Sequence, residues 1–185
     1  MTNSAEKMYS VRALAADELS VRYRDAALDV FSAAIGFPRR HSRVVGLGDA
    51  MRRHASYGGF RAFGAFGAQD KLVGFSYGYT SQPGLWWREQ IVPALSEQQR
   101  DYWLADAFEV VELHVHPSAQ GHKLGSALHD RLVAGLPNKT ALLSVMHRSE
   151  RARQLYGRRG WQTLLGDMRF STDPATPFSV MGLEL

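Results

Sequence analysis

The feature that most constrains the fold is a strand-like run that passes directly into a glycine-containing turn and then into a helix-like run. The strand-like residues are "VVELHV" (110–115), and the turn and helix lie within "PSAQGHKLGSALHDRL" (117–132). From Leu124 to Leu132, apolar residues recur at i, i+3, i+4 and i+8, which is the spacing of one buried helix face. Such a unit requires a sheet and a covering helical layer, and it indicates an α/β fold.

Strand-like and helix-like segments alternate along the rest of the chain, and "AQDK" (68–71) is typical of a hairpin turn. At 185 residues the chain is short enough for one domain, so we predict a single domain over 1–185 with an insert at 81–107. The predicted strands are 8–14, 60–68, 72–80, 108–116, 140–147, 163–170 and 179–185. The predicted helices are 17–34 with Asp17 as its cap, 48–56, a short one after Ser96, 123–135 and 150–159.

Composition excludes several classes of protein. The chain has no cysteine, which rules out disulfides, a thiol nucleophile and cysteine-ligated zinc. No apolar run approaches the roughly 20 residues that span a bilayer, and the first residues lack the apolar block of a signal peptide. The net charge of +4 comes from scattered arginines rather than one stripe. We therefore expect a cytoplasmic protein with no nucleic-acid and no membrane partner.

The turn itself predicts an anion site. Gly121 and Gly125 flank it, and in a strand-to-helix turn of this kind successive backbone N–H groups point outward without partners. The positive end of the following helix adds to them. The sequence therefore favours binding of a pyrophosphate, although a tight turn without a ligand would have the same pattern.

Two motifs give the C-terminal half a resemblance to a known family. "ELHVHPSAQGHKLGSAL" (112–128) followed by "ARQLYGRRGW" (152–161) resembles the GNAT superfamily, the acetyl-CoA-dependent N-acetyltransferases. The family signature is Gln or Arg, two residues, Gly, one residue, then Gly or Ala. The matching residues are Gln120, Leu124 and Gly125 in the first motif and Ala152, Leu155, Tyr156, Gly160 and Trp161 in the second.

The resemblance implies a mixed, mostly antiparallel sheet with flanking helices and a cofactor in a splay between two central strands. It implies direct transfer of an acetyl group from acetyl-CoA, without a metal, to an amine that we expect to be a small molecule. Homodimers are common in the family. The alternative is a non-catalytic acyl-CoA-binding sensor or partner domain with the same fold.

The resemblance also assigns roles by position. Backbone groups of Leu113, His114 and Val115 would pair with the pantetheine arm, and N–H groups from Gly121 to Ser126 would hold the pyrophosphate. Tyr156 would protonate the leaving thiolate as general acid, unless it is only a core aromatic residue. The complete predicted cofactor-binding set is Leu113, His114, Val115, Gln120, Gly121, His122, Lys123, Leu124, Gly125, Ser126 and Ser149.

Two residues depart from the family pattern. Lys123 stands where the signature has its first glycine, and we expect it to adopt the right-handed helical conformation that lysine tolerates. Ser149 stands where many members carry an asparagine that binds the cofactor. Its hydroxyl can still donate a hydrogen bond, with shorter reach.

Glu112 is the best candidate for the general base, because alternation along the strand places it on one face with His114 and His116. A structural carboxylate paired with an arginine is the alternative role, and His114 is the second candidate base. Some family members instead place the general base on the neighbouring strand, but the strand at 140–147 offers only Ser144 for that role. The same Glu112, His114 and His116 could form a facial metal site, which we disfavour because the family role already uses this strand.

Trp86 and Trp87, in the insert, are candidates for an acceptor pocket or lid, or for packing of the insert onto the sheet. The run "GFSYG" (74–78) fits the G-x-S-x-G nucleophile elbow of serine hydrolases. That elbow requires a helix directly after the serine, and "YTSQPG" cannot begin one. We therefore interpret Ser76 as an ordinary strand residue.

Overall fold

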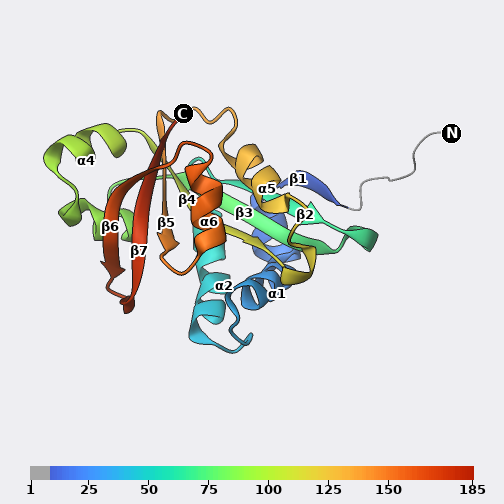
Figure 1. The fold of residues 1–185 in the computed structure, drawn as a ribbon. Helices are drawn as coiled ribbons and strands as arrows, with labels where there is room; N and C mark the ends of the chain where they lie inside the picture. The colour runs from blue at the N-terminus through green and yellow to red at the C-terminus, as the bar shows by residue number, and fades with distance from the viewer. Residues whose placement is uncertain (1–8) are drawn as a thin grey trace. The chain divides into compact units, whose positions relative to one another are not determined.

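The computed structural model describes residues 9–185, and these residues form two compact units (Figure 1). The first unit contains the chain up to Tyr79 together with Glu112–Ala134. The second contains Thr80–Val111 and Gly135–Leu185. The predicted first strand began at Met8, which lies outside the described residues, and a single domain over 1–185 stays a prediction.

The first unit combines four strands in the order β1-β2-β3-β4 with four main helices. The pairs β1–β2 and β2–β3 are antiparallel. Where β4 lies beside β3, the N–H of His116, which directly follows β4, donates to the carbonyl of Val73 on β3 at 2.8 Å. The strands are β1 Ser10–Leu14, β2 Arg61–Phe66, β3 Leu72–Thr80 and β4 Ala107–Val115. The helices are η1 Glu18–Arg22, α1 Arg24–Ile35, α2 Ser42–His54 and α5 Leu124–Val133, with short 3-10 turns η2 Ala68–Asp70 and η4 Pro117–Ala119.

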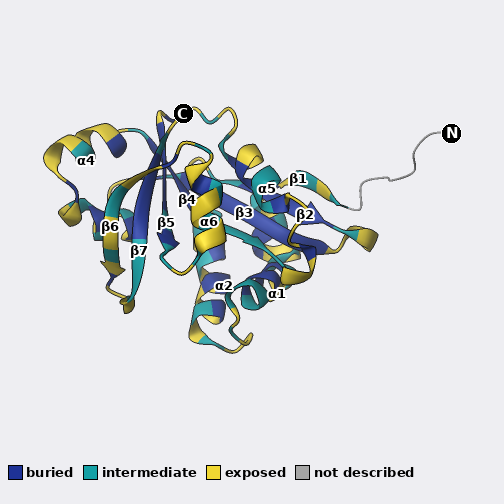
Figure 2. Ribbon diagram, in the orientation of Figure 1, coloured by how far each residue is buried: buried dark blue, intermediate teal, exposed yellow. Residues whose placement is uncertain are grey.

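Alternation along β3 gives the first unit two different faces. The hydroxyl of Ser76 donates to the carbonyl of Leu128 on α5 at 3.3 Å. The next residue, Tyr77, points the other way, and its hydroxyl lies 3.1 Å from Nδ1 of His54 on α2. Because neighbouring strand residues point to opposite faces, α5 covers one face and α2 the other. Figure 2 shows β3 as a buried strand throughout most of its length.

The Ser76 prediction is confirmed by this arrangement. Ser76 is fully buried in the middle of β3, and the strand continues to Thr80 without a helix. The hairpin turn before β3 is confirmed as well, since Gln69 and Asp70 have the positive φ angles of 54° and 57° that a tight turn requires.

The predicted helix from Asp17 to residue 34 is wrong at its start. A π-helix, η1, comes first, and α1 follows from Arg24. Asp17 makes no side-chain cap because its own backbone is already helical, at φ −71° and ψ −32°. The carboxylate of Glu18 instead accepts the N–H of Ala15 at 2.9 Å.

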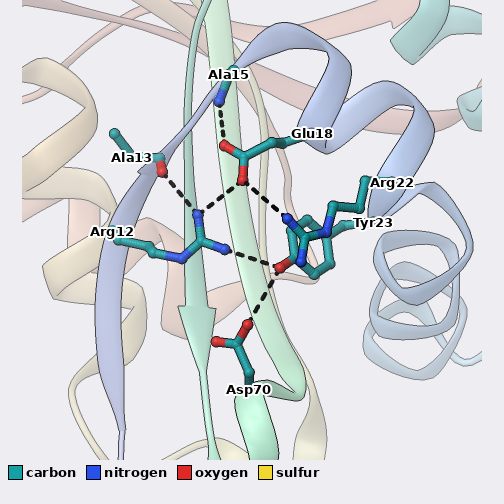
Figure 3. Close-up of polar contacts among 7 residues, drawn as sticks. All are labelled: Arg12, Ala13, Ala15, Glu18, Arg22, Tyr23 and Asp70. Atoms are coloured by element: carbon teal, nitrogen blue, oxygen red, sulfur yellow. Dashed lines mark hydrogen bonds and ion pairs between the residues drawn. The ribbon is translucent and has the colours of Figure 1, made fainter.

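A polar network fixes this corner of the first unit (Figure 3). Nη1 of Arg12 donates to Glu18 at 3.2 Å, and Nη2 donates to the Tyr23 hydroxyl at 2.9 Å. The Tyr23 hydroxyl donates in turn to Asp70 at 3.3 Å. The network therefore joins β1, the start of α1 and the β2–β3 turn.

The predicted helix at 48–56 begins six residues earlier, at Ser42. Nδ1 of His41 accepts the N–H of Arg43 at 3.3 Å, so a histidine acts as the N-cap. Histidine is not among the usual capping residues, which explains why this helix start was not predicted.

The second unit has the strand order β4-β5-β7-β6. The pair β4–β5 is parallel, and the pairs β5–β7 and β6–β7 are antiparallel. Its strands are β5 Thr140–Met146, β6 Gln162–Phe170 and β7 Asp173–Glu184. Its helices are α3 Trp86–Ile91, the 3-10 turn η3 Val92–Ala94, α4 Glu97–Trp103 and α6 Glu150–Gly157. The predicted class, a mixed and mostly antiparallel sheet with flanking helices, is confirmed.

The insert at 81–107 forms part of the core of the second unit. Trp87, Ile91 and Trp103 share one buried cluster with Leu142 of β5 and Val180 of β7. The helix α3 was not predicted, because its two tryptophans directly follow a Pro-Gly turn and have only moderate helix propensity. The short helix after Ser96 is confirmed as α4.

The last strand is longer than predicted, since β7 begins at Asp173 rather than at residue 179. The added part contains Pro174 and Pro177, which lack the N–H that a regular ladder uses. They lie where the pairing with β6 is irregular, between the pairs Phe170–Asp173 and Met168–Phe178.

Candidate active site

The strand β4 changes character along its length. Ala107–Val110 are buried, whereas the five residues from Val111 to Val115 are each partly exposed. Its parallel pairing with β5 covers only three residue pairs and ends at Glu109 and Leu142. The strand therefore runs on past the end of its ladder with β5, and its last four residues, Glu112–Val115, belong to the first unit.

The turn after β4 offers a set of backbone donors. Gly121 has φ 85°, and α5 begins at Leu124 without a side-chain cap. Within residues 9–185, the N–H groups from Gly121 to Ser126 have no hydrogen-bond acceptor, and the first intrahelical bond is donated by Ala127 to Lys123 at 3.0 Å. These donors and the helix dipole together suit a phosphate group.

The expected conformation of Lys123 is wrong. Its φ of 60° and ψ of 15° place it in the left-handed region rather than the right-handed one. A residue with a Cβ atom adopts that conformation at a cost of about 1–2 kcal/mol. The turn therefore requires positive φ at the position where the family signature has glycine, and this chain places a strained, exposed lysine there.

The neighbouring predicted residues have local roles. The side-chain amide of Gln120 donates to the carbonyl of Val115 at 3.1 Å, which ties the turn back to the strand. The exposed ring of His122 lies 5.0 Å from the ring of Tyr9. Nδ1 of His116 accepts the N–H of Ser118 at 3.2 Å and caps the 3-10 turn η4.

Two polar residues in the partly exposed half of β4, Glu112 and His114, meet on one face, as alternation predicted. Oε2 of Glu112 lies 2.6 Å from Nε2 of His114. The arginine partner proposed as the structural alternative for Glu112 is absent from the ion pairs found in residues 9–185. Nor do those residues contain a cluster of three His, Asp or Glu side chains placed to hold a metal ion.

Sequence reasoning missed His54, which lies on the same face at the end of α2. Burial, with a smaller contribution from the charge of nearby Arg53, lowers the pKa of His54 to about 4, and Glu112 opposes the shift. Its imidazole is therefore neutral at neutral pH. Contacts with the rings of Tyr57 and Tyr79, at 5.4 and 5.0 Å, surround it with aromatic groups. No local motif marks a histidine whose partners lie on distant strands.

In the second unit, Tyr156 is buried on α6, with its ring 5.6 Å from that of Trp161. Ser149 precedes α6, and its N–H donates to the carbonyl of Met146 at 3.0 Å. Within residues 9–185 its hydroxyl makes no hydrogen bond and is free to donate. The helix predicted at 150–159 ends two residues earlier, at Gly157, and Gly160 follows with a φ of 82° that favours glycine.

The two tryptophans of the insert differ. Trp87 is buried, and its Nε1 donates to the hydroxyl of Ser144 at 3.2 Å, so it holds the insert against β5. Trp86 is 50% exposed, with its ring 5.8 Å from that of Phe170. Of the two, Trp86 is the one accessible to a ligand.

The uncapped glycine turn after β4 and the two sequence motifs agree with a fold of the GNAT class. Comparison with solved structures confirms the fold. An acetyltransferase of the GNAT family from Bacillus cereus matches with a TM-score of 0.60 and 11% identity, covering 96% of this chain and 97% of that one. The ribosomal-protein-S18-alanine N-acetyltransferase from Escherichia coli matches with a TM-score of 0.63 and 18% identity, covering 96% and 94%.

A similar protein sequence also supports the resemblance to the GNAT superfamily. A GCN5-like protein acetyltransferase of Mycobacterium tuberculosis is 36% identical over 125 residues, which cover 62% of this chain. The matched part is 59% of that protein, so the chain spans about three fifths of the length of its curated relative. No family model matches the sequence. The chain has the GNAT fold, and the predicted resemblance to the GNAT superfamily is confirmed. None of the helices in residues 9–185 is both long and apolar enough to cross a bilayer.

Proposed function

We propose that the protein is an N-acetyltransferase that moves an acetyl group from acetyl-CoA to an amine. The observation that carries the proposal is the run of N–H groups from Gly121 to Ser126, which have no acceptor within residues 9–185. Acetyl-CoA contains a pyrophosphate, which such donors bind well. The similarity to a GCN5-like protein acetyltransferase supports the same activity.

The chain's own groups would supply binding and proton transfer. Backbone groups of Leu113, His114 and Val115 would pair with the pantetheine arm, and the Ser149 hydroxyl would add a donor. Glu112 would take a proton from the acceptor's ammonium group, and the Tyr156 phenol would give one to the departing thiolate. Bound acetyl-CoA supplies the activated acyl group as a thioester.

The composition supports direct transfer without an acyl-cysteine intermediate. The chain has no cysteine to carry an acyl group as a thioester. The amine nitrogen would therefore attack the thioester carbonyl itself, forming the amide bond as the carbon–sulfur bond breaks. The second proton that the nitrogen loses would restore the Tyr156 phenol after it has protonated the thiolate. The main contribution of the protein would be to hold the two reactants in attack geometry.

The acceptor amine belongs to one of two classes, a small molecule or a protein. A small-molecule amine is the predicted class, and half-exposed Trp86 is an aromatic surface that such a molecule could contact. A protein amine is the other class. Two proteins similar to this chain are a GCN5-like protein acetyltransferase and the ribosomal-protein-S18-alanine N-acetyltransferase. A homodimer stays a prediction.

The test begins with calorimetric titration of acetyl-CoA and of CoA lacking the 3′-phosphate. Thiol release is then followed with small amines and with peptides that carry free lysine or N-terminal amines, and Tyr156→Phe serves as the matched control. Micromolar binding with turnover that Tyr156→Phe reduces would support the proposal. Binding without turnover on either acceptor class would favour the sensor function, and no binding would reject both.

A further inference from the structure

Glu112 and His114 are joined by a short hydrogen bond between their side chains. The two residues are separated by one position on β4, so their side chains lie on the same face. Their facing atoms, Oε2 and Nε2, are 2.6 Å apart, in the range of charge-assisted hydrogen bonds. Both side chains are about one fifth exposed, at 23% for Glu112 and 19% for His114, so the pair is accessible from solvent.

The imidazole of His114 is held in place by aromatic rings on its other sides. The ring of Phe31, from α1, meets it edge-on at 4.8 Å and 83°. The ring of Phe75, from β3, lies 5.8 Å away. These contacts restrict rotation of the His114 side chain, so Nε2 stays directed at the carboxylate.

The direction of the hydrogen bond follows from the chemistry of the two groups. A carboxylate can only accept a hydrogen bond, so Nε2–H of His114 is the donor and Oε2 of Glu112 is the acceptor. The bond fixes the tautomer of His114, with its proton on Nε2. It also holds one oxygen of Glu112 and directs the other oxygen away from His114.

The other titratable groups on this face do not replace His114. His54, from α2, is a neutral imidazole at neutral pH, and its Nδ1 is occupied with the hydroxyl of Tyr77 from β3. The positive charge of Arg53, also from α2, lowers the pKa of His54. From α1, the ring of Phe31 contacts His114, and it carries no charge.

We propose that His114 is a positioning residue that orients the carboxylate of Glu112 for proton transfer from the acceptor amine. The inference rests on the proposed function. In the step concerned, an N–H bond of the acceptor's ammonium breaks and an O–H bond forms on the free oxygen of Glu112. The electron pair left on nitrogen then attacks the acyl group, and His114 keeps its own proton throughout.

A double-mutant cycle on the full chain tests this role. Glu112→Gln is expected to lower kcat/KM about 100-fold, in the usual range for loss of a general base. His114→Leu fills similar space without a donor, and it is expected to lower kcat about 10-fold while KM for acetyl-CoA changes less than about twofold. In the Glu112→Gln background, the same His114→Leu change is expected to cost less than about twofold, because its effect passes through Glu112.

His114→Gln is the matched variant, since its amide can donate from nearly the same place. It is expected to keep more than about half of the wild-type kcat. Thermal unfolding of each variant verifies that it is folded. If His114→Leu costs the same factor with and without Glu112, or if His114→Gln loses as much as His114→Leu, the positioning role is overturned.

A spectroscopic measurement tests the hydrogen bond without turnover. Long-range ¹H–¹⁵N correlations of the His114 imidazole should show the Nε2–H tautomer in the wild type and a shift towards the other tautomer in Glu112→Ala. An Nδ1–H tautomer in the wild type would overturn the inference while leaving the transferase proposal intact. A wild type that binds acetyl-CoA but acetylates no amine would instead reject the proposed function, and the catalytic role of His114 with it.

Discussion

The helices α4 and α5 begin in opposite ways. At α4, the Ser96 hydroxyl accepts the N–H of Gln99 at 3.1 Å, and the Gln99 side chain accepts the N–H of Ser96 at 3.0 Å. At α5 there is no side-chain cap, and Lys123 is strained in the left-handed region. The first helix start satisfies two of its own N–H donors, whereas the second leaves the N–H groups from Gly121 to Ser126 without an acceptor in residues 9–185. A missing cap lowers stability by about 1 kcal/mol, which suggests that α5 gives up stability for binding.

Placing a carboxylate at the second residue of each helix gives the largest expected contrast. Gly125→Glu in α5 should weaken acetyl-CoA binding at least about 100-fold, because it directs negative charge at the proposed pyrophosphate site. The matched control is Gln98→Glu, at the same position of α4, which should leave binding unchanged. Calorimetric titration measures both. Micromolar affinity in folded Gly125→Glu would show that the turn does not hold the pyrophosphate.

Lys123 offers the next contrast, because it combines strain with charge. Lys123→Gly should raise the free energy of unfolding by about 0.5–1 kcal/mol, since the strain removed exceeds the added chain entropy. It should also weaken acetyl-CoA binding about 5-fold, because a cation beside the turn is lost. Denaturant unfolding and calorimetry measure the two effects.

Lys123→Arg is the control, since it keeps both the charge and the strain and should resemble the wild type. If Lys123→Gly binds acetyl-CoA as tightly as the wild type, the lysine charge does not reach the ligand.

The same contrast explains what the sequence could predict. The capping pattern at Ser96 and the apolar spacing after Leu124 are local signals, and both helices were found from them. The conformation of Lys123 was missed because lysine is a poor predictor of positive φ, and the backbone there is set by the strand and helix on either side. The glycine signature of the resembled family pointed to the correct geometry at this position, while the residue present pointed away from it.

Contacts between segments that are distant in the sequence could not be predicted from local sequence patterns. The Glu112–His114 pair follows from alternation on one strand and could be anticipated. The place of His54 beside it depends on how α2 packs against β3, through Tyr77. In the insert, the burial of Trp87 depends on a cluster shared with β5 and β7. Periodicity identifies a buried face but does not identify its partner.

The cap of α4 can be tested with a smaller expected effect. Ser96→Ala should lower the free energy of unfolding by about 1 kcal/mol, because the N–H of Gln99 loses its acceptor. Acetyl-CoA affinity should not change. Ser96→Asp restores an acceptor and should regain most of the stability in denaturant unfolding. A loss of acetyl-CoA affinity in Ser96→Ala would break the distinction between a structural and a binding helix start.

The start of η1 provides the smallest test, because the Glu18 carboxylate that accepts the N–H of Ala15 there is only partly buried. Figure 3 shows its partners. The N–H of Ala15, together with Arg12 and Arg22, holds the pKa of Glu18 below its ordinary value of 4.5, with the Ala15 hydrogen bond as the largest cause. A carboxyl group whose pKa is lower in the folded state stabilises the fold above its ordinary pKa. That stabilisation is lost as the pH falls through the folded-state pKa.

Glu18→Gln keeps an oxygen that can accept the N–H of Ala15 but removes the charge. Its Tm should therefore lie slightly below that of the wild type at pH 7 and at pH 5.5. The difference should disappear towards pH 3, where Glu18 of the wild type is also becoming neutral. Circular dichroism melts at the three pH values measure it. A Tm difference that is equally large at pH 3 would mean that the shape of the side chain, rather than its charge, holds this helix start.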